Sequence, residues 1–273
     1  MRNRVAFISL LAGIALTVSA MQVHAQAREE GQLLMATQIL EELSATPDTF
    51  IPERLLDRAY AIAVVPDVTK VAFIAGGRRG SGAMVVRDKD GHFSNPVFVA
   101  LTGGSFGWQA GVQSTDVVLV FTTRTGVEGI TGGKVTLGAD ASVAAGPVGR
   151  QASIATDSNF TAEVYSYSRN RGLFAGIALD GSVLSIDRGA NAEFYKKSGV
   201  TASEIMDGEV KTTDSTAQRF LAAISASTGG NTSPASAPMA GASPPPPAAP
   251  PAPPAGAAQT YPMADPQPGT EPK

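Results

Sequence analysis

Short apolar segments alternate with glycine in Lys70–Ile186, and this pattern narrows the choice of fold more than any other feature of the sequence. Residues 83–87 and 93–100 have the length and composition of strands, and Asp88–Gly91 between them is a hairpin turn sequence. Residues 117–122 are continuously apolar, as in a strand buried on both faces. Glycine inside a strand marks a bulge, a sharp bend or the close approach of another backbone. We therefore expect an α+β fold with a strongly curved, Gly-rich antiparallel sheet, curved enough to become barrel-like.

Helical periodicity appears on both sides of this strand-rich segment. Residues 29–45 and 53–63 each place apolar side chains on one side of a helical wheel, which predicts two N-terminal helices. Residues 215–225 predict a closing helix, and Ser215 with Gln218 forms a capping-box pattern at its start. The expected sheet is therefore flanked by N-terminal helices and a C-terminal helix.

The first 25 residues have the order of regions found in a secretory signal peptide. Arg2 and Arg4 precede an apolar run over residues 5–21, and residues 23–25 supply a small–x–small cleavage pattern. An uncleaved membrane anchor is the alternative, because an apolar run of ~17 residues is at the short end for a membrane span. We expect an exported protein that is periplasmic or membrane-associated after cleavage.

Residues 229–273 differ sharply in composition from the rest of the chain, because most of the 19 prolines lie there. Such a segment buries too little apolar surface to offset its chain entropy, so we expect a disordered Pro/Ala-rich tail. It would serve as a tether or spacer, or alternatively as a ligand for a proline-recognising module. The folded unit is then expected to span residues 26–228.

The scarcity of cysteine and histidine excludes many kinds of active site. The chain has no cysteine, which removes disulfides, thiolate zinc sites and a cysteine nucleophile, and its two histidines are His24 and His92. A net charge of −3 gives no overall basic field, so a nucleic-acid partner is not expected. No two acidic residues have a spacing that argues for acid–base catalysis. We expect no metal site and no cofactor.

One serine motif matches a hydrolase pattern. Gly103–Gly107 reads G-x-S-x-G, which is the nucleophile elbow of hydrolases in which the histidine follows the serine in sequence. No histidine follows His92, and His92 lies beside the expected hairpin turn. A structural glycine hairpin is favoured, and we expect no catalytic residues and no enzymatic activity.

A second glycine-rich segment, Gly76–Gly82, contains two adjacent arginines. It does not match the Walker A pattern, and no predicted helix follows it to receive a phosphate. Arg78 and Arg79 on a glycine loop could still donate charge-assisted hydrogen bonds to a phosphate headgroup. The other interpretation is a solvated tight turn between strands.

Two aspartates fall among the apolar strand sequences. An unpaired carboxylate buried there would be unfavourable, so Asp116 and Asp140 are expected to have a cationic partner. Arg124, Lys134 and Arg150 are the candidates.

The helix predicted over residues 29–45 has two interpretations. Its apolar side, which includes Leu33, Leu34 and Ile39, would pack against the core, or it would insert into the headgroup region of a membrane. Its polar side carries glutamates, which weakens any attraction to anionic lipid.

Several specific motifs occur in a fixed order along the chain: Lys70–Phe73 with Gly76-Gly77, Gly103–Gly111, Ser114–Val118, Gly146–Arg150, Tyr165–Ser168 with Gly172–Gly176, and Asn191 with Phe194-Tyr195. With these motifs the sequence resembles the SYLF domain family over nearly all of residues 26–228. The resemblance implies a lipid-binding domain, because eukaryotic members bind phosphoinositides and membranes through basic residues and an N-terminal amphipathic segment. Fungal members bind actin, and bacterial members are exported. This chain departs from the eukaryotic architecture, since it carries no SH3 or FYVE module.

The sequence therefore predicts a non-enzymatic, exported protein that binds anionic phospholipid headgroups at a membrane surface. The alternative is a structural or protein-interaction module of the cell envelope that reaches an envelope protein partner through the tail. The residues expected to contact lipid are Lys70, Arg78, Arg79, Leu33, Leu34 and Ile39.

Overall fold

The computed structural model describes residues 26–43, 51–72, 75–106, 111–147, 161–170 and 173–228. The chain divides into two units, Met1–Thr232 and Ser233–Lys273, and all described residues belong to the first. The expected signal peptide and tail lie outside the described residues, as do Trp108 and Arg150.

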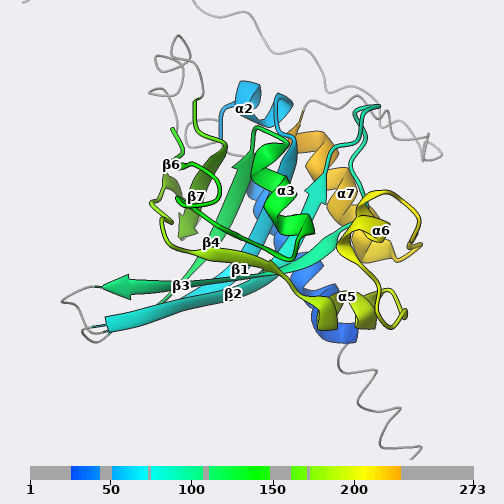
Figure 1. Ribbon diagram of the computed structural model, residues 1–273, viewed down its shortest axis with the longest axis horizontal. Helices are drawn as coiled ribbons and strands as arrows, with labels where there is room; N and C mark the ends of the chain where they lie inside the picture. Colours follow the sequence, from blue (N-terminus) through cyan, green and yellow to red (C-terminus); the bar gives the residue numbers. More distant parts are fainter. Residues whose placement is uncertain are drawn as a thin grey trace, which may run out of the picture. The chain divides into compact units, whose positions relative to one another are not determined.

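A nine-stranded sheet forms the centre of this unit (Figure 1). Its order is β5-β9-β3-β2-β1-β4-β7-β6, with β8 also paired to β7. All pairs are antiparallel except β6 with β7, which confirms the expected antiparallel sheet. The strands are β1 Ala61–Ala72, β2 Ala75–Val86, β3 Val97–Phe106, β4 Gly111–Phe121, β5 Lys134–Thr136, β6 Val143–Ala145, β7 Val164–Asn170, β8 Leu173–Gly176 and β9 Val183–Ile186.

Helices lie on both faces of the sheet. An N-terminal helix over residues 26–43 and the last helix lie behind the sheet in Figure 1, and α3 lies in front of it. The α+β class with flanking N-terminal and C-terminal helices is therefore confirmed. The remaining helices are α2 Glu53–Asp57, α3 Thr125–Thr131, α5 Arg188–Phe194, α6 Ala202–Met206 and α7 Ser215–Ser227.

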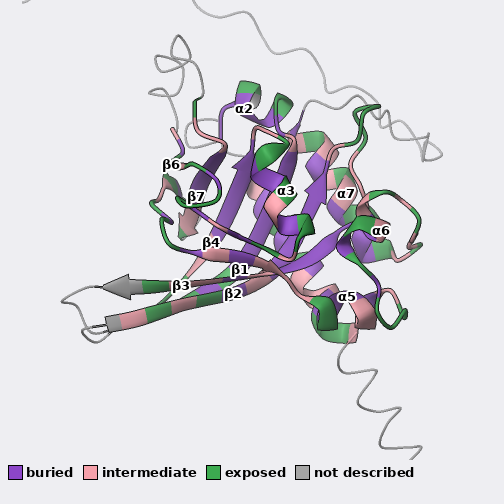
Figure 2. Ribbon diagram, viewed as in Figure 1, coloured by how far each residue is buried: buried purple, intermediate pink, exposed green. Residues whose placement is uncertain are grey.

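Each face of the sheet has its own hydrophobic core. Ile62 and Val64 of β1 pack with the N-terminal helix and α7, whereas Ala63 and Val65 pack with α3 on the other face. Successive side chains of a strand point to opposite faces, so a strand between two cores must be apolar at every position. Val117–Phe121 of β4 fits this rule, because each of its side chains is at most 1% exposed. Figure 2 shows this buried centre of the sheet.

The side chain of Asn191 fastens α5 to the sheet. It accepts a hydrogen bond from the backbone nitrogen of Phe98 (2.9 Å) and donates one to the Phe98 oxygen (3.0 Å). Strand β9 pairs with β3 only from Val99 onward. At Phe98, the side-chain amide of Asn191 takes the place of a strand partner. Asn191 is only 1% exposed, and its polar atoms are satisfied by these bonds and by one to the oxygen of Asp187.

Two predicted helix features are wrong. The helix expected over residues 53–63 ends at Asp57, and β1 begins at Ala61. Residues 61–64 pair with β2 on one side and β4 on the other, and this pairing outweighs the local helical pattern. The capping box at Ser215 is also absent, because Asp214 caps α7 by accepting from the nitrogens of Thr216 and Ala217.

The glycine-rich segment Gly76–Gly82 is a strand rather than a loop or a tight turn. It lies within β2, pairs with β3 along its whole length and pairs with β1 at residues 77–79. Glycine is a poor strand former in isolation, but Gly82 is needed where it is. A Cβ there would lie 2.1 Å from the carbonyl oxygen of Val64. The glycines therefore allow close packing of neighbouring backbones.

Candidate functional site

The ends of β1 to β4 extend beyond the rest of the sheet. Pairing of β3 with β9 stops at Thr102, and pairing of β4 with β7 stops at Asp116. Beyond these points the four strands pair only with one another, and β2 and β3 project past the helices in Figure 1. We call this extension the arm; it comprises residues 69–72, 75–79, 103–106 and 111–114.

A bulge in β1 marks the boundary between the arm and the remainder of the sheet, which we call the body. The register of β1 with β4 shifts between Val65 and Val68, and Asp67 within the bulge has a φ of 48°. Val65 and Val68 are buried, whereas Val71 beyond the bulge is 52% exposed. The change in environment thus takes place within a few residues of one strand.

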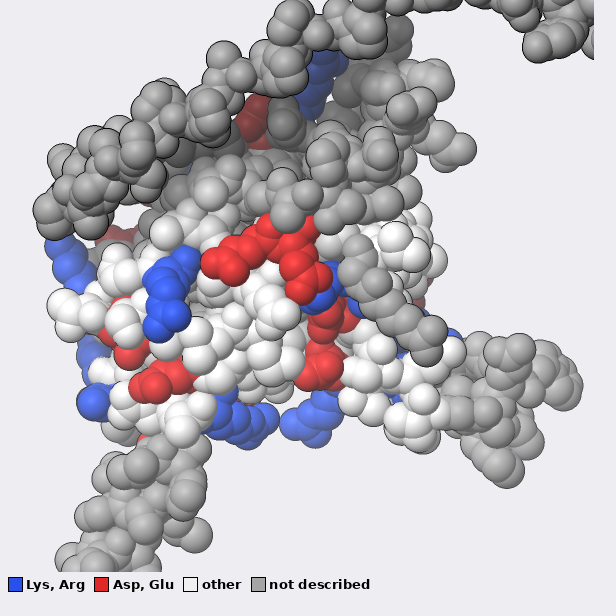
Figure 3. All heavy atoms as spheres, turned by 180° about the vertical axis from the view of Figure 1, so that it is seen from behind, with Lys and Arg blue, Asp and Glu red and all other residues white. Residues whose placement is uncertain are grey.

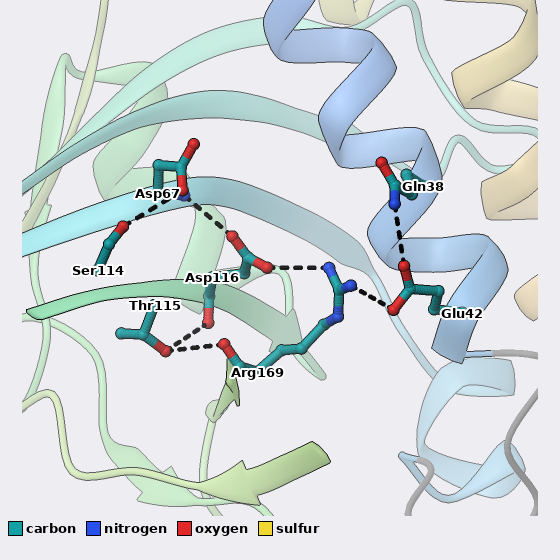
Figure 4. A network of polar contacts seen from close by, with 7 residues as sticks. All are labelled: Gln38, Glu42, Asp67, Ser114, Thr115, Asp116 and Arg169. Carbon is teal, nitrogen blue, oxygen red and sulfur yellow. Dashed lines mark hydrogen bonds and ion pairs between the residues drawn. The ribbon is translucent and has the colours of Figure 1, made fainter. Parts of the chain in front are cut away.

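A polar network holds this boundary against the N-terminal helix (Figure 4). Arg169 of β7 donates from Nη1 to Oδ2 of Asp116 at 2.9 Å, and its Nη2 pairs with Glu42 of the N-terminal helix. Oδ1 of Asp116 accepts a hydrogen bond from the backbone nitrogen of Asp67 at 3.0 Å. The side chains of Arg169 and Asp116 are 14% and 19% exposed, so both charges are largely withdrawn from water. The network therefore connects the helix, two strands and the bulge.

Asp116 has a cationic partner, as predicted, but the partner is Arg169 and not one of the expected residues. Asp116 lies directly opposite Arg169 in the β4–β7 register, which brings the two side chains to the same face. Arg124, one of the expected partners, instead pairs with Glu128 at the surface. Arg150 lies outside the described residues.

Asp140 is not a buried ion pair. It lies in an exposed turn, where Oδ2 accepts from the backbone nitrogen of Thr136 at 2.7 Å. This hydrogen bond is the main reason why the pKa of Asp140 is lowered from its ordinary value. A solvated turn provides the carboxylate with water and backbone donors, so no cationic partner is required.

The register of the arm separates the three basic residues that the sequence placed together. Lys70 of β1 lies directly opposite Arg78 of β2, so these two side chains share a face. Arg79 lies opposite Thr69 and Thr102 and therefore points to the other face. Ser114 pairs with Thr69 and lies two residues before Asp116, which contacts the N-terminal helix through Arg169. Arg79 is accordingly on the helix side of the arm, and Lys70 and Arg78 are on the α3 side.

An exposed apolar pair lies near the end of the arm. Val71 and Val112 are direct partners between β1 and β4, and they are 52% and 72% exposed. Gly77 and Gly104 continue the same row across β2 and β3 and leave the valines uncovered on that side. Sequence reasoning missed this pair, although apolar residues beside a glycine-rich strand were a usable signal.

The three leucine and isoleucine positions predicted to touch lipid are divided between core and surface. Leu33 and Ile39 are 0% and 2% exposed, and both belong to the core between the N-terminal helix and the sheet. In this conformation they are not available to a membrane, and the core-packing interpretation of the helix holds for them. Leu34 is 42% exposed and lies on the outer side of the helix.

The serine motif is not arranged as a nucleophile elbow. Such an elbow is a sharp turn from strand to helix, whereas Gly103 to Phe106 continue β3 and the next described element is strand β4. His92 lies in the turn before β3, next to the bridge between Arg87 and Phe93. The part of β3 from Val97 to Ser105, which is about 26 Å long at the usual rise per strand residue, lies between the two residues. A serine–histidine pair is excluded by this separation.

Metal chemistry finds no support in the described part of the chain, where no three His, Asp or Glu side chains are grouped so that they could hold an ion. Within the same residues, every helix is too short or too polar to span a membrane.

Comparison with known proteins agrees with the motifs. Residues 102–227 match the family model described as Ysc84, Las17-binding protein actin regulator. Over these residues the chain is similar to the Ysc84, or SYLF, family. The family that the sequence motifs indicated is thus confirmed, and it is not a family of enzymes.

Fungal and animal proteins are among the relatives. LAS seventeen-binding protein 3 of Saccharomyces cerevisiae is 38% identical over 167 residues, which are 60% of this chain and 36% of the yeast protein. SH3 domain-containing YSC84-like protein 1 of Xenopus laevis is 34% identical over 181 residues, which are 64% of this chain and 54% of the frog protein. The matched region thus spans about a third to a half of these curated relatives.

Proposed function

We propose that this SYLF domain is a non-enzymatic module that binds an anionic membrane surface with its arm. The observation that carries the proposal is the exposed pair Val71 and Val112 on the helix side of the arm, with Lys70 and Arg78 one position closer to the body on the other side. Apolar side chains at the end of an element, with cations behind them, match the order of hydrocarbon and charged headgroups in a leaflet.

The expected affinity is modest. A Lys or Arg near an anionic leaflet contributes about 1 kcal/mol, and burying a valine contributes roughly 1.5 kcal/mol or less when it is already partly covered. Three cations and two valines together give about 5 kcal/mol, which corresponds to a dissociation constant of roughly 0.1–1 mM. Binding should therefore be reversible and should weaken as salt screens the charges.

The charge of the helix side supports an end-on approach. Acidic side chains gather across the middle of the face that carries the N-terminal helix, and basic side chains lie around them (Figure 3). An anionic membrane repels that face, so the favoured contact is through the arm, whose charged residues on both faces are basic.

Flotation of the full chain with vesicles tests the proposal. The wild type should float with vesicles rich in phosphatidylglycerol at low salt, less at high salt, and hardly at all with phosphatidylcholine alone. The variant Val71→Asp/Val112→Asp should lose at least tenfold in binding, because it places two carboxylates against the anionic surface. Leu173→Asp is the matched control, since Leu173 is 63% exposed but lies outside the arm on β8. Equal binding by the arm variant and the control would refute the role of the arm.

The site of action is a second part of the proposal. We propose that the domain works outside the cytoplasm, on the strength of the signal-peptide pattern in the first 25 residues. Mass spectrometry of the protein recovered from its own cells should find Gln26 at the N-terminus. A protein that retains Met1 and stays in the cytoplasm would contradict export without affecting the arm.

A protein partner is the second candidate function. The description of the family as a Las17-binding actin regulator supports a role in protein binding. The surface that would suit such a partner includes Leu34 and Met35 on the N-terminal helix, which are 42% and 40% exposed. Their neighbour Glu41 is also exposed, so a basic, apolar peptide would fit. A purified partner that still binds the Val71→Asp/Val112→Asp variant but not Leu34→Asp/Met35→Asp would favour this function over membrane binding.

A further inference from the structure

The two faces of the arm carry different numbers of basic residues: Lys70 and Arg78 share one face, and Arg79 lies on the other. We propose that the α3 side of the arm holds a seat for one phosphate group, formed by Lys70, Arg78 and the hydroxyl of Ser182. The inference deepens the proposed membrane function and rests on it only for the source of the phosphate. Its ligand class is a phosphate monoester or inorganic phosphate, which share the same set of oxygen acceptors.

Strand pairing brings the seat together from three distant parts of the chain. Lys70 of β1, Arg78 of β2 and Gly103 of β3 are successive partners across the sheet, so they lie in one row on one face. A Cβ on Gly103 would point to 2.7 Å from Oγ of Ser182, just before β9. The hydroxyl therefore lies over Gly103, on the same face as Arg78 and Lys70.

Two polar atoms in this row are buried and lack a partner. Ser182 is completely buried, and its Oγ has no hydrogen-bond partner in the structure. Nε of Arg78 is also buried without one. Buried polar atoms are nearly always hydrogen-bonded in proteins, so an unsatisfied donor on each side of one glycine indicates a missing acceptor. Phosphate oxygens accept from a hydroxyl, from guanidinium groups in a bidentate manner and from an ammonium group.

The charges in the row point to the same kind of ligand. Lys70 and Arg78 are direct cross-strand partners, and like charges in that position repel each other. Neither forms an ion pair within the described part of the chain. An anion held between them would turn this repulsion into two attractions. Arg79 lies on the opposite face, where it can contribute to the general field but not to the seat.

Glycine at position 103 is what allows Ser182 to lie against this row. Any larger residue would place its Cβ against the Ser182 hydroxyl, at 2.7 Å from Oγ and 3.2 Å from Cα. The backbone of Gly103 has no positive φ, so its conformation does not itself demand glycine. The close approach to Ser182 does.

Titration of the full chain with inorganic phosphate, followed by calorimetry, tests the seat directly. Arg78→Ala and Lys70→Ala should each weaken phosphate binding at least tenfold, and Ser182→Ala about threefold. Arg79→Ala removes the same charge from the other face of the arm, and it should change binding less than twofold. Thermal unfolding of each variant shows whether it is folded. Ser182→Ala keeps every charge and nearly the same volume, so the test survives if an arginine variant does not fold.

Flotation with vesicles distinguishes the source of the phosphate. Vesicles containing phosphatidate, a phosphomonoester, should bind the wild type more tightly than phosphatidylglycerol vesicles of equal charge, and Arg78→Ala should abolish the difference. Equal losses for Arg78→Ala and Arg79→Ala in both assays would overturn the seat and leave only general electrostatic attraction. Phosphate binding without binding to any vesicle would keep the seat, assign it to a soluble phosphate and refute the membrane function.

Discussion

The four strands of the arm, β1 to β4, also run through the body, yet the two regions differ in almost every property. In the body, residues 117–121 of β4 are at most 1% exposed, whereas Val112 in the arm part of the same strand is 72% exposed. The body is covered by helices on both faces, and the described residues of the arm extend past this cover (Figure 2). Strand pairing alone therefore does not determine burial, and the comparison separates the stabilising part of the sheet from the part free to bind.

Truncation of a core side chain should give the largest difference between the two regions. Phe98→Ala removes a fully packed ring of β3 that also contacts Phe194, at a ring distance of 5.1 Å. We expect a loss of about 3–5 kcal/mol in the free energy of unfolding, whereas Val112→Ala in the arm should change it by less than ~0.5 kcal/mol. Urea denaturation measures both. A loss above ~2 kcal/mol for Val112→Ala would mean that the arm is covered in solution.

Glycine substitutions should repeat the contrast within the glycine-rich strands. A Cβ on Gly82 would meet the Val64 oxygen at 2.1 Å, and because this neighbour is backbone it cannot move aside easily. Gly82→Ala should destabilise by about 3 kcal/mol, the upper end for overpacking. Gly104 in the arm has no atom within 4 Å of its Cβ position, so Gly104→Ala should be neutral or slightly stabilising. Similar thermal unfolding midpoints for the two variants would contradict the difference in packing.

Removal of Arg169 tests the network at the boundary between the two regions. Arg169→Met leaves Asp116 and Glu42 without their shared cation, and loss of one partner of a fully buried pair costs about 3–5 kcal/mol. Because these side chains are partly exposed, we expect about 2 kcal/mol here. Arg124→Met is the control, since its pair with Glu128 is 70% and 62% exposed and should contribute less than ~0.5 kcal/mol. A double-mutant cycle with Asp116→Asn should show coupling, and additive effects would argue against the network.

The smallest expected effect is a pH dependence in α6, a helix that packs against the body. Glu204 of α6 accepts from Lys197 at 2.8 Å and closes a capping box with Thr201, which lowers its pKa to about 2. A carboxylate whose pKa is lower when folded stabilises the protein above its ordinary pKa of 4.5. That contribution should decline as the pH falls from 4.5 towards 2. Glu204→Gln should therefore be less stable than the wild type at pH 7, and most of this difference should be lost by pH 2. A constant difference across this range in denaturation experiments would assign the effect to something other than the charge.

Local patterns in the sequence predicted those features that depend on neighbouring residues. The turn at Asp88–Gly91 is present, with Gly91 at a φ of 87°, and the closing helix spans Ser215–Ser227. The continuous apolar run at residues 117–122 indicated a strand that is buried on both faces. A strand with one face in water would carry polar side chains at every second position. The motif residue Asn191 was visible as a resemblance, but its role as a substitute strand partner for Phe98 was not.

The patterns failed where distant segments decide the outcome. Residues 58–63 have a helical pattern, but from Ala61 onward the chain pairs with β2 and β4 and becomes a strand of the sheet. The partner of Asp116 could not be chosen from sequence, because it depends on the register of β4 with β7, 53 residues further along the chain.

By itself, the sequence determined the alternation of strands and turns, the absence of thiols, the scarcity of histidine, and the presence of basic residues among glycines. The tertiary structure alone decided which of those basic residues act together. Arg78 and Arg79 are neighbours in the chain, but a strand sends successive side chains to opposite faces, so Arg78 joins Lys70 and Arg79 does not. Burial was likewise decided in three dimensions, because it depends on which segments of the chain cover a strand, and the helices that cover the body stop short of the arm.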